Sequence, residues 1–392
     1  MWDLLVVGAG PAGSAAALAA LAARPGASVL LLDAADFPRD KTCGDGVAAE
    51  AVDELVAVGA RGVVADCRPV PWLRLTAPGG ATVAAPFARP SWVLPRRVLD
   101  ARLVLAAQEA GAELRRERVR GLRVTADAVE VGAHRARVVV GADGVHSAVR
   151  RALGIPSNPP WATALAVRGY AAAGPGGSDG DEQWVRMVRD GWPAYAWSFP
   201  LSTGGGSNVG FGAYADRVPA GDPRWLHRRL AQLLPAEPAD PTSLRAAHLP
   251  LSTWRPRQPD GRVLLAGDAA SLVHPLTGEG IWYAVVSGRL AGAAAVGGAG
   301  GGAAGGGAGA AYRSALARRL GPHLAVTTLL GRAARRTPAL VDVAVAACDG
   351  DSDSFDALVG LGLAGGLPTM RLVRGMLRAG LGRARTGGTI MR

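Results

Sequence analysis

Cysteine, lysine and aromatic side chains are all scarce in this chain of 392 residues. The three cysteines, Cys43, Cys67 and Cys348, are too few and too scattered for a disulfide framework. No pair of them has the spacing of a zinc site or of a redox CxxC motif. We therefore expect no metal site and a reducing, cytoplasmic setting.

Long apolar runs are also missing, although hydrophobic residues make up 49% of the chain. No run reaches the ~18–20 apolar residues that a membrane-spanning helix needs, and glycines interrupt the apolar segment at residues 357–367. The apolar residues 1–8 lack a basic region and a cleavage site, so they predict a β-strand rather than a signal peptide. We expect no transmembrane span.

Lysine occurs once, as Lys41, so arginine supplies nearly all of the positive charge behind the net charge of +11. The preference for arginine over lysine, together with the many alanines and glycines, is typical of a GC-rich coding bias. Such a bias explains the positive charge without assigning it a role in binding. The alternative is attraction to anionic lipid or to an acidic redox partner. Nucleic-acid binding is not expected, because no basic motif interleaved with aromatic residues is visible.

Buried strands and helices alternate near the start of the chain. Residues 4–7 and 28–32 predict parallel strands on either side of an alanine-rich helix at 14–23. A second helix is predicted at 98–110. Two further buried strands are predicted at 138–140 and 263–265.

The middle of the chain has a different amino-acid composition. Residues 157–250 are rich in Trp, Tyr, Gly and Pro, and their alternating stretches predict antiparallel strands, to which residues 69–94 are expected to contribute. Residues 291–311 are almost entirely Ala and Gly and are interpreted as a helix that continues into a flexible loop. Helices are then predicted at 312–330, 340–347 and 370–379.

A glycine-rich turn follows the first predicted strand and opens the first helix. The motif is Gly8-Ala9-Gly10-Pro11-Ala12-Gly13. Gly8 allows the tight turn, Gly10 lets the backbone approach a pyrophosphate, and Gly13 lets the helix pack on the strand. The helix N-terminus stabilises phosphate charge. Asp33, at the end of the second strand, can bond ribose hydroxyls, so the segment predicts dinucleotide binding.

Two later segments each place glycine and aspartate after a buried strand. They are Asp143-Gly144 and Gly267-Asp268. In this order the three segments resemble the glutathione-reductase-type flavoproteins and, more narrowly, the class A flavin monooxygenase superfamily. The resemblance implies that Gly267-Asp268 holds the ribityl and pyrophosphate of FAD, and that Asp143 lies near FAD and, in hydroxylases, near a transient NADPH. A turn or cap carboxylate is the alternative for either aspartate.

Arg96 precedes the second helix and stands four residues before Asp100. The resemblance implies that this arginine lies near the flavin phosphates. Arg97 is an alternative for that role, and a surface position in an arginine-rich chain is another.

Three further features resemble the geranylgeranyl reductase family, over about residues 1–320. They are residues 41–47 (KTCGDGV), residues 191–200 (GWPAYAWSFP) with 209–212 (VGFG), and residues 275–284 (PLTGEGIWYA) with 287–288 (SG). The resemblance implies hydride delivery from flavin N5 to an isoprenoid double bond. It also implies a Cys-Gly loop that covers the flavin and an aromatic stretch that shapes a lipid-facing pocket. Asp45 departs from the pattern, since many relatives have glycine there.

Residues of the second and third features are candidates for substrate contact. Tyr195, Trp197 and Phe199 share one face of a predicted strand, and such an aromatic wall suits a large apolar substrate. Ordinary packing of the sheet core is the alternative. Trp192 and His274 complete the candidate substrate-binding set, with a structural role as the alternative for His274.

Cys43 is the candidate catalytic residue. A proton-delivering or reactive thiol beside a flavin is attractive, and Lys41 with a glycine loop would lower the pKa of Cys43. The alternative is a small residue that merely fits the loop. Gly278 and Gly280 flank the start of a helix and expose backbone N–H groups that can stabilise reduced flavin. The candidate cofactor-binding residues are Gly8, Ala9, Gly10, Pro11, Ala12, Gly13, Asp33, Ala34, Cys43, Gly44, Arg96, Val119, Asp143, Gly267, Asp268, Gly278, Gly280 and Ile281.

The expected fold class is α/β, with a glutathione-reductase-type, Rossmann-like FAD domain, a mixed antiparallel-sheet substrate domain and a C-terminal helical region. The FAD domain is assigned to residues 1–68, 95–155 and 255–300. The substrate domain is assigned to 69–94 and 156–254, and the helical region to 311–392.

The leading hypothesis is an FAD-dependent reductase of carbon–carbon double bonds in an isoprenoid or other apolar, lipid-like substrate. A class A monooxygenase that hydroxylates or epoxidises an aromatic, polyketide or terpenoid substrate is the alternative. A flavin halogenase and a non-enzymatic FAD-binding scaffold are the remaining hypotheses. NAD(P)H, a reductase and a ferredoxin are candidate electron donors, and peripheral contact with a membrane is an option for a lipid substrate.

Overall fold

The apolar N-terminal strand β1 (Trp2–Val7) lies inside a seven-stranded sheet. The structure is a computed structural model that describes residues 1–172, 180–220, 222, 224–236, 238–297 and 307–387. The strand order is β6-β2-β1-β9-β8-β7, and β15 pairs with β9. The parallel strands are β2 (Val29–Asp33), β6 (Glu113–Arg116), β9 (His134–Gly141) and β15 (Val263–Leu265). β8 (Val129–Val131) and β7 (Arg123–Val124) are antiparallel.

Helices cover this first sheet because its central strands are buried on both faces. They are α1 (Pro11–Ala23), α3 (Arg96–Glu109), α4 (Ala148–Ala152) and α6 (Ile281–Gly297), and α2 (Ala49–Val56) packs against α6 and β5. α1 and α6 lie backbone to backbone, since a Cβ on Gly288 or Gly292 would overlap the carbonyl oxygen of Ala12 or Ala16. The predicted strands and helices of this region are present, each within a few residues of its expected bounds.

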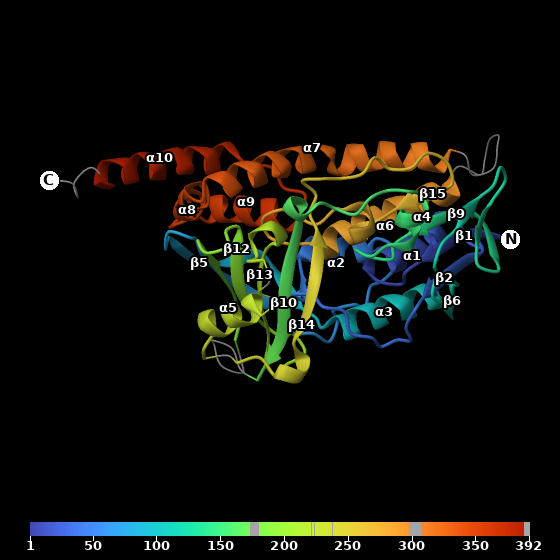
Figure 1. Cartoon of the computed structure of the whole chain (residues 1–392), viewed down its shortest axis with the longest axis horizontal. Helices are drawn as coiled ribbons and strands as arrows, with labels where there is room; N and C mark the ends of the chain where they lie inside the picture. Colours follow the sequence, from blue (N-terminus) through green and yellow to red (C-terminus); the bar gives the residue numbers. More distant parts are fainter. Residues whose placement is uncertain (173–179, 221, 223, 237, 298–306, 388–392) are drawn as a thin grey trace.

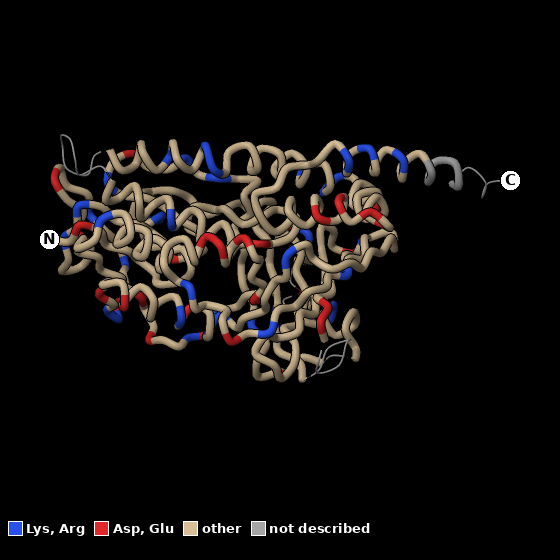
Figure 2. Tube along the Cα trace, turned by 180° about the vertical axis from the view of Figure 1, so that it is seen from behind, with Lys and Arg blue, Asp and Glu red and all other residues tan. Residues whose placement is uncertain are grey.

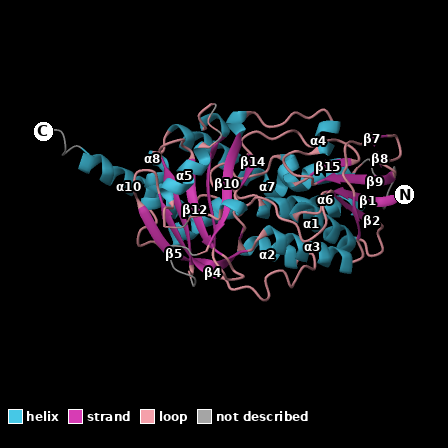
Figure 3. Ribbon diagram, turned by 60° about the horizontal axis from the view of Figure 1, so that its bottom comes forward, coloured by secondary structure: helices cyan, strands magenta, loops and turns pink. Residues whose placement is uncertain are grey.

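A second sheet of eight strands lies beside the first (Figures 1 and 3). Its order is β14-β10-β13-β12-β11-β4-β5-β3, and only the β11–β4 pair is parallel among the pairs that the structure describes. The strands are β3 (Gly46–Val47), β4 (Val70–Thr76), β5 (Thr82–Val93), β10 (Thr163–Ala171), β11 (Glu182–Val188), β12 (Ala194–Pro200), β13 (Ser207–Tyr214) and β14 (Arg245–Pro250). Residues 69–94 supply two of these strands, as the sequence predicts.

Two details of this sheet were not predicted. β3 lies within the first expected FAD segment, yet it pairs with β5 of the second sheet. Helix α5 (Trp225–Leu233) covers part of this sheet, and its Trp225 ring lies 5.5 Å from the ring of Phe211 on β13.

The chain ends in a helical layer. It comprises α7 (Ala308–Arg336), α8 (Ala339–Ala346), α9 (Ser352–Leu363) and α10 (Met370–Gly387). α7 runs along the length of the molecule, and α10 projects beyond the second sheet at the end opposite the N-terminus (Figure 1). Of the Ala/Gly stretch at 291–311, the first part is helical as expected, and residues 298–306 lie outside the described residues.

α9 was not predicted, although the sequence carries a signal for it. Asp351 accepts a hydrogen bond from the backbone N–H of Ser354, which is the pattern of a helix N-cap. The apolar residues 357–367, which overlap α9, are interrupted by glycines and too short to span a membrane. Within the described part of the chain, none of the helices is sufficiently long and apolar to cross a bilayer.

Candidate functional site

A cavity of about 1410 Å³ is lined by both sheets and by the C-terminal helices. Its volume exceeds the roughly 300–1,000 Å³ of an ordinary small-molecule pocket, so there is room for a large cofactor and a second molecule. All the predicted cofactor- and substrate-binding residues line this cavity except Ala9 and Gly13. Segments far apart in the sequence therefore meet at one site.

The glycine turn has the geometry that its sequence predicts. Gly8 has a φ of +94°, and a Cβ on it would overlap the carbonyl oxygen of Ala142 at the end of β9. A Cβ on Gly13 would overlap the carbonyl oxygen of Gly8 and lie 3.1 Å from Val6. Only glycine at both positions lets the N-terminus of α1 sit this close to β1.

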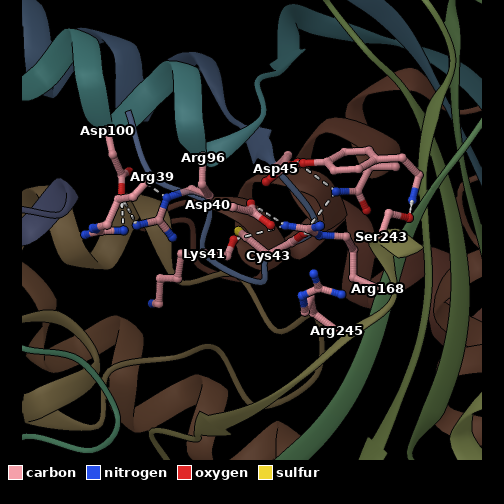
Figure 4. Close-up of polar contacts among 12 residues, drawn as sticks. Arg39, Asp40, Lys41, Cys43, Asp45, Arg96, Asp100, Arg168, Ser243 and Arg245 are labelled. Atoms are coloured by element: carbon pink, nitrogen blue, oxygen red, sulfur yellow. Dashed lines mark hydrogen bonds and ion pairs between the residues drawn. The ribbon is translucent and has the colours of Figure 1, made fainter. Parts of the chain in front are cut away.

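Two arginines lie beside Gly10, where the sequence predicts the approach of a pyrophosphate. A Cβ on Gly10 would lie 3.4 Å from Nη2 of Arg96 and 3.6 Å from Nη2 of Arg39. The buried Arg96 forms two hydrogen bonds of 2.7 and 2.8 Å with Asp100, and Arg39 pairs with the same carboxylate at 3.0 Å (Figure 4). Burial opposes the charge of Arg96, but Asp100 outweighs it and the pKa of Arg96 is raised.

Asp33 connects the glycine turn to this arginine pair. One carboxylate oxygen accepts a hydrogen bond of 2.9 Å from the backbone N–H of Ala9 and lies 3.4 Å from Nη2 of Arg39. The other oxygen accepts one of 3.0 Å from the N–H of Ala35. The sequence predicts roles for Asp33 and Arg96 but not for Arg39, which lies six residues after Asp33 and carries no motif of its own.

Asp143 serves as a turn carboxylate, the alternative that the sequence left open. It accepts hydrogen bonds from the hydroxyl of Ser147 at 2.5 Å and from the backbone N–H groups of Ala148 and Val149 at 2.6 and 3.2 Å. These bonds hold the start of α4. Asp143 and Gly144 also line the cavity, so contact of this turn with a cofactor stays a prediction.

Asp268 follows β15 and pairs with Lys41, which also lines the cavity. Nζ of Lys41 lies 3.0 Å from a carboxylate oxygen of Asp268. Gly267 has a φ of +58°, and a Cβ on it would lie 3.2 Å from Cβ of Ala12. The third predicted segment therefore meets the glycine turn as expected, whereas the partnership with Lys41 was missed.

The loop at residues 40–46 is fixed to the second sheet through Asp45, whose φ is +63°. Its fully buried side chain accepts hydrogen bonds of 2.8 Å from the hydroxyl of Tyr170 and from Nδ2 of Asn208. Burial raises the pKa of Asp45 to about 6, although Arg168 and Tyr170 act in the opposite direction. The residue that departs from the family pattern therefore anchors the loop.

Arg168 and Asn208 complete this anchor through the loop backbone. Nε of the buried Arg168 donates to the carbonyl oxygen of Cys43 at 3.2 Å, and Nη2 pairs with Asp40 at 2.8 Å (Figure 4). Nδ2 of Asn208 donates to the same carbonyl at 2.9 Å. Arg168 lies 125 or more residues from its loop partners in the sequence, so no local pattern points to it.

The structure corrects the expectation for the Cys43 thiol. Burial raises the pKa of Cys43, and the nearby positive charges of Arg96 and Lys41 do not reverse this shift. The negative charge of Asp45 also acts to raise it. Cys43 lines the cavity as a protonated thiol, which suits proton delivery and not a low-pKa nucleophile.

The aromatic residues of β12 face the cavity as predicted. The rings of Tyr195 and Trp197 lie 5.8 Å apart, and those of Trp197 and Phe199 lie 6.4 Å apart. Nε1 of Trp197 donates to Oδ1 of Asn208 at 2.9 Å. A Cβ on Gly210 would overlap the Trp197 ring, so this glycine makes room for it.

Hydrogen bonds join this wall to its surroundings. The hydroxyl of Tyr195 donates to the carbonyl oxygen of Thr277, in the turn that precedes α6. Trp192 also lines the cavity, and its Nε1 donates to the carbonyl oxygen of Ala334 on α7 at 2.8 Å. The aromatic wall is thereby linked both to the predicted flavin turn and to the C-terminal layer.

The turn before α6 is held by its own side chains. Nδ1 of His274 accepts hydrogen bonds from the backbone N–H groups of Leu276 and Thr277 at 3.2 and 3.1 Å. Burial lowers the pKa of His274 to about 3, with His323 acting in the same direction, so His274 is a neutral acceptor at neutral pH. This is the structural role that the sequence left as the alternative, although His274 also lines the cavity.

Gly278 and Glu279 complete the turn. Gly278 has a φ of +69°, and a Cβ on it would lie 2.9 Å from the hydroxyl of Tyr195. Glu279 accepts a hydrogen bond of 2.7 Å from the backbone N–H of Trp282. Burial raises the pKa of Glu279 to about 7, against the hydrogen bonds that it accepts at the start of α6. The sequence predicts Gly278, Gly280 and Ile281 as site residues here, whereas this glutamate was not predicted.

Comparisons with known proteins agree with this geometry. Residues 1–167 match the family described as FAD binding domain. Menaquinone reductase of Mycobacterium tuberculosis is 36% identical over 318 residues, which cover 74% of this chain and 75% of that protein. The chain belongs to the geranylgeranyl reductase family of FAD-dependent oxidoreductases.

Two further relatives extend the comparison. Digeranylgeranylglycerophospholipid reductase 2 of Methanopyrus kandleri is 34% identical over 325 residues, 75% of this chain and 76% of that protein. The crystal structure of a geranylgeranyl bacteriochlorophyll reductase-like protein from Thermoplasma acidophilum has a TM-score of 0.74 at 22% identity. That match covers 96% of this chain and 95% of the other, and it shows the shared fold.

As a member of this family the chain is an FAD-dependent oxidoreductase, and its cradle fits FAD. The closely packed turn at Gly8 and Gly13 leaves backbone N–H groups at the start of α1 for phosphate. The guanidinium groups of Arg39 and Arg96 lie beside that turn. The cavity continues from there past Gly267 to the turn at Gly278.

The far part of the cavity is apolar and was not predicted. Side chains from the C-terminal layer line it, and six of them are Leu330, Leu340, Val341, Leu358, Leu361 and Leu372. In the sequence these residues are ordinary apolar positions of helices, and nothing indicates that they line a cavity. Their gathering around one cavity depends on how α7 to α10 pack on the second sheet.

Proposed function

We propose that this protein reduces carbon–carbon double bonds in an isoprenoid or similarly long apolar substrate. One observation carries the proposal: the same cavity is lined by the FAD cradle, by the aromatic wall of Tyr195, Trp197 and Phe199, and by apolar side chains of the C-terminal helices. A long apolar chain fits such a cavity with one end beside the cofactor. The names of the two reductase relatives, which refer to menaquinone and to a digeranylgeranyl lipid, agree with this substrate class.

When bound, FAD supplies the hydride for such a reduction. The protein orients the substrate against the aromatic wall and excludes water from the reacting carbons. Cys43 and Asp45 lie in the loop at the cavity and both have raised pKa values. We assign the delivery of the proton to this loop, with the protonated thiol of Cys43 as the first candidate.

The electron donor and the location belong to the same proposal. NAD(P)H is the donor that we propose first, and a reductase or ferredoxin is the alternative. All three cysteines are free, which agrees with a reducing cytoplasmic setting. Because the proposed substrate is lipid-like, we also propose that the protein contacts the surface of a membrane.

The test is an anaerobic single turnover. The FAD-loaded protein is reduced by light and mixed with a panel of prenyl lipids, and the products are analysed by mass spectrometry. A gain of two hydrogen atoms by one of the lipids is expected. No reduction of any lipid, together with a gain of one oxygen atom in air with NAD(P)H, would overturn the proposal in favour of the class A monooxygenase.

A further inference from the structure

Helix α10 carries an apolar stripe that is exposed to solvent. Met370, Leu377 and Leu381 are 67%, 64% and 66% exposed, and Val373 is 37% exposed. At about 100° per residue these four positions fall within a sector of about 80° on the helix. The opposite side packs on the protein, because Leu372 is buried there and Gly375 approaches Ala347 of α8. The stripe is thus a second apolar face and not the core face of the helix.

A row of positive charge runs beside this stripe. Arg374 and Arg378 are exposed, and neither forms an ion pair among the described residues. Arg371 is paired with Asp351, the N-cap of α9, and with Asp353 on α9. Figure 2 shows basic residues in blue along α10, the helix nearest the C-terminus. After Asp356 the sequence contains six arginines and no acidic residue. An apolar stripe bordered by arginines is typical of helices that lie in a membrane interface.

The mouth of the cavity lies at the same face. Val373, Met376 and Leu377 of α10 line the cavity, as does Leu340 of α8. Leu377 and Leu340 are also exposed to solvent, so the apolar lining reaches the surface beside the stripe. The apolar surface of α10 and the apolar part of the cavity are therefore continuous.

We propose that α10 docks the protein on an anionic lipid bilayer and presents the cavity mouth to the acyl chains. The apolar stripe would enter the boundary between headgroups and acyl chains while the arginines contact anionic headgroups. Docking on the bilayer would let an isoprenoid enter the cavity without passing through water. This role of the docking depends on the proposed function. The docking itself depends only on the surface of α10.

The charge of α10 favours a bilayer over a second copy of this chain as the partner that covers the apolar stripe. Two copies of α10 packed stripe to stripe would bring Arg374 and Arg378 of both helices together, and α10 has no acidic residue of its own to pair with them. An anionic bilayer supplies both the apolar phase and the negative charge. Self-association is nevertheless an outcome that the experiment can detect.

The experiment measures binding of the FAD-loaded, full-length protein to vesicles by sedimentation. Vesicles of phosphatidylcholine alone are compared with vesicles that also contain phosphatidylglycerol. Binding is expected only with the anionic lipid and is expected to weaken as salt is added. The double variant Arg374→Gln/Arg378→Gln should bind about thirtyfold more weakly, since each arginine contributes about 1 kcal/mol at such a surface.

A second pair of substitutions tests the apolar stripe at residues that do not line the cavity. Met370→Asp/Leu381→Asp should lower binding by at least about tenfold, because two apolar anchors become charged. Leu105→Asp, at an exposed leucine of α3, and Arg61→Gln, at an exposed arginine, are matched controls that should bind like the wild type.

Three results would overturn the inference: no binding of the wild type to anionic vesicles, equal binding by the α10 variants, or an α10-dependent dimer in light scattering. Failure of the proposed function is recognised separately. The α10 variants at positions 370, 374, 378 and 381 should retain wild-type turnover of a short, water-dispersed prenyl substrate. Absence of that turnover in the wild type contradicts the reductase proposal and leaves the vesicle result valid.

Discussion

At the residue scale, Cys43 shows how burial and neighbouring charge act in opposite directions on a thiol. The sequence places Lys41 two residues away and so predicts a lowered pKa. The structure places the half-buried Cys43 at the cavity, pairs Lys41 with Asp268, and brings the carboxyl of Asp45 close to the thiol. Burial dominates, so the thiol keeps its proton.

The first prediction follows from the raised pKa of Cys43. Alkylation of Cys43 by iodoacetamide should be slow at neutral pH and should accelerate only at a higher pH than in the unfolded protein, because the pKa of Cys43 is raised and the thiolate is the reactive form. Mass spectrometry of the labelled protein measures this rate as a function of pH. The unfolded protein, in which the same cysteine is freely solvated, is the control. A plateau already reached near neutral pH would contradict the prediction.

The second prediction concerns Asp45 in the flavin-free protein. Its folded pKa of about 6 lies above the ordinary value of 3.8, so the folded state binds the proton more tightly than the unfolded state. The resulting contribution of Asp45 to the free energy of unfolding is fully present below about pH 4 and is lost as the pH rises through 6. The total loss is roughly 3 kcal/mol. Asp45→Asn should remove this part of the pH dependence while keeping the hydrogen bonds from Tyr170 and Asn208.

Urea unfolding at about pH 5 and about pH 8 measures the effect. The wild type should lose more stability between these two conditions than Asp45→Asn does. Glu279→Gln is a useful companion, because the pKa of Glu279 is raised to about 7 by the same cause. An unchanged pH dependence in Asp45→Asn would show that Asp45 is not the group responsible.

At the element scale, the contact between α1 and α6 brings the first and third cofactor segments together. Gly288 and Gly292 stand one turn apart on α6 and meet the backbone of α1 at Ala12 and Ala16. The spacing of small residues allows the two helix backbones to touch. The turn that begins α6 is thus held in a fixed position relative to the glycine turn that begins α1.

The third prediction tests this contact. Gly288→Ala should lower the free energy of unfolding by about 1–3 kcal/mol, because a methyl group must displace the backbone of α1. Gly380→Ala in α10 is the matched control, since no atom lies within 4 Å of a Cβ there. Alanine is the better helix former, so the control should be neutral or stabilising by up to about 1 kcal/mol. Equal effects of the two substitutions would contradict the tight contact.

At the scale of the whole molecule, the cofactor site joins parts of the chain that are remote in the sequence. The arginine pair comes from the loop after β2 and from α3, whereas Asp268 follows β15. A ligand that binds all of these parts in the folded state stabilises the whole fold.

The fourth prediction uses this coupling. FAD at about 100 times its Kd should raise the free energy of unfolding by about 2.7 kcal/mol. Arg39→Gln should weaken FAD binding by about tenfold or more, since a charged hydrogen bond contributes about 1.5–3 kcal/mol. Fluorescence titration of FAD measures the affinity, and Arg116→Gln, at an exposed arginine paired with Asp36, is the control. Equal affinity of the Arg39 variant and the wild type would contradict a phosphate role for Arg39.

Much of the FAD cradle could be predicted because its chemistry is local. Gly8 and Gly13 are required by a single turn, and Asp33 follows the next strand along the chain. Arg39 and the pairing of Lys41 with Asp268 could not be predicted in the same way, because their positions depend on loop paths and on partners up to 227 residues away. The same holds for Arg168, which fixes the Cys43 loop from the second sheet.

The sequence by itself determined the α/β class, the FAD cradle and the aromatic face of β12, since glycine turns and strand alternation are short-range patterns. Only the tertiary structure decided the protonated state of Cys43, the burial of Asp45, and the apolar path from the cradle to α10. Burial and cavity shape depend on which distant elements pack together. That packing is a property of the whole chain and of no single segment.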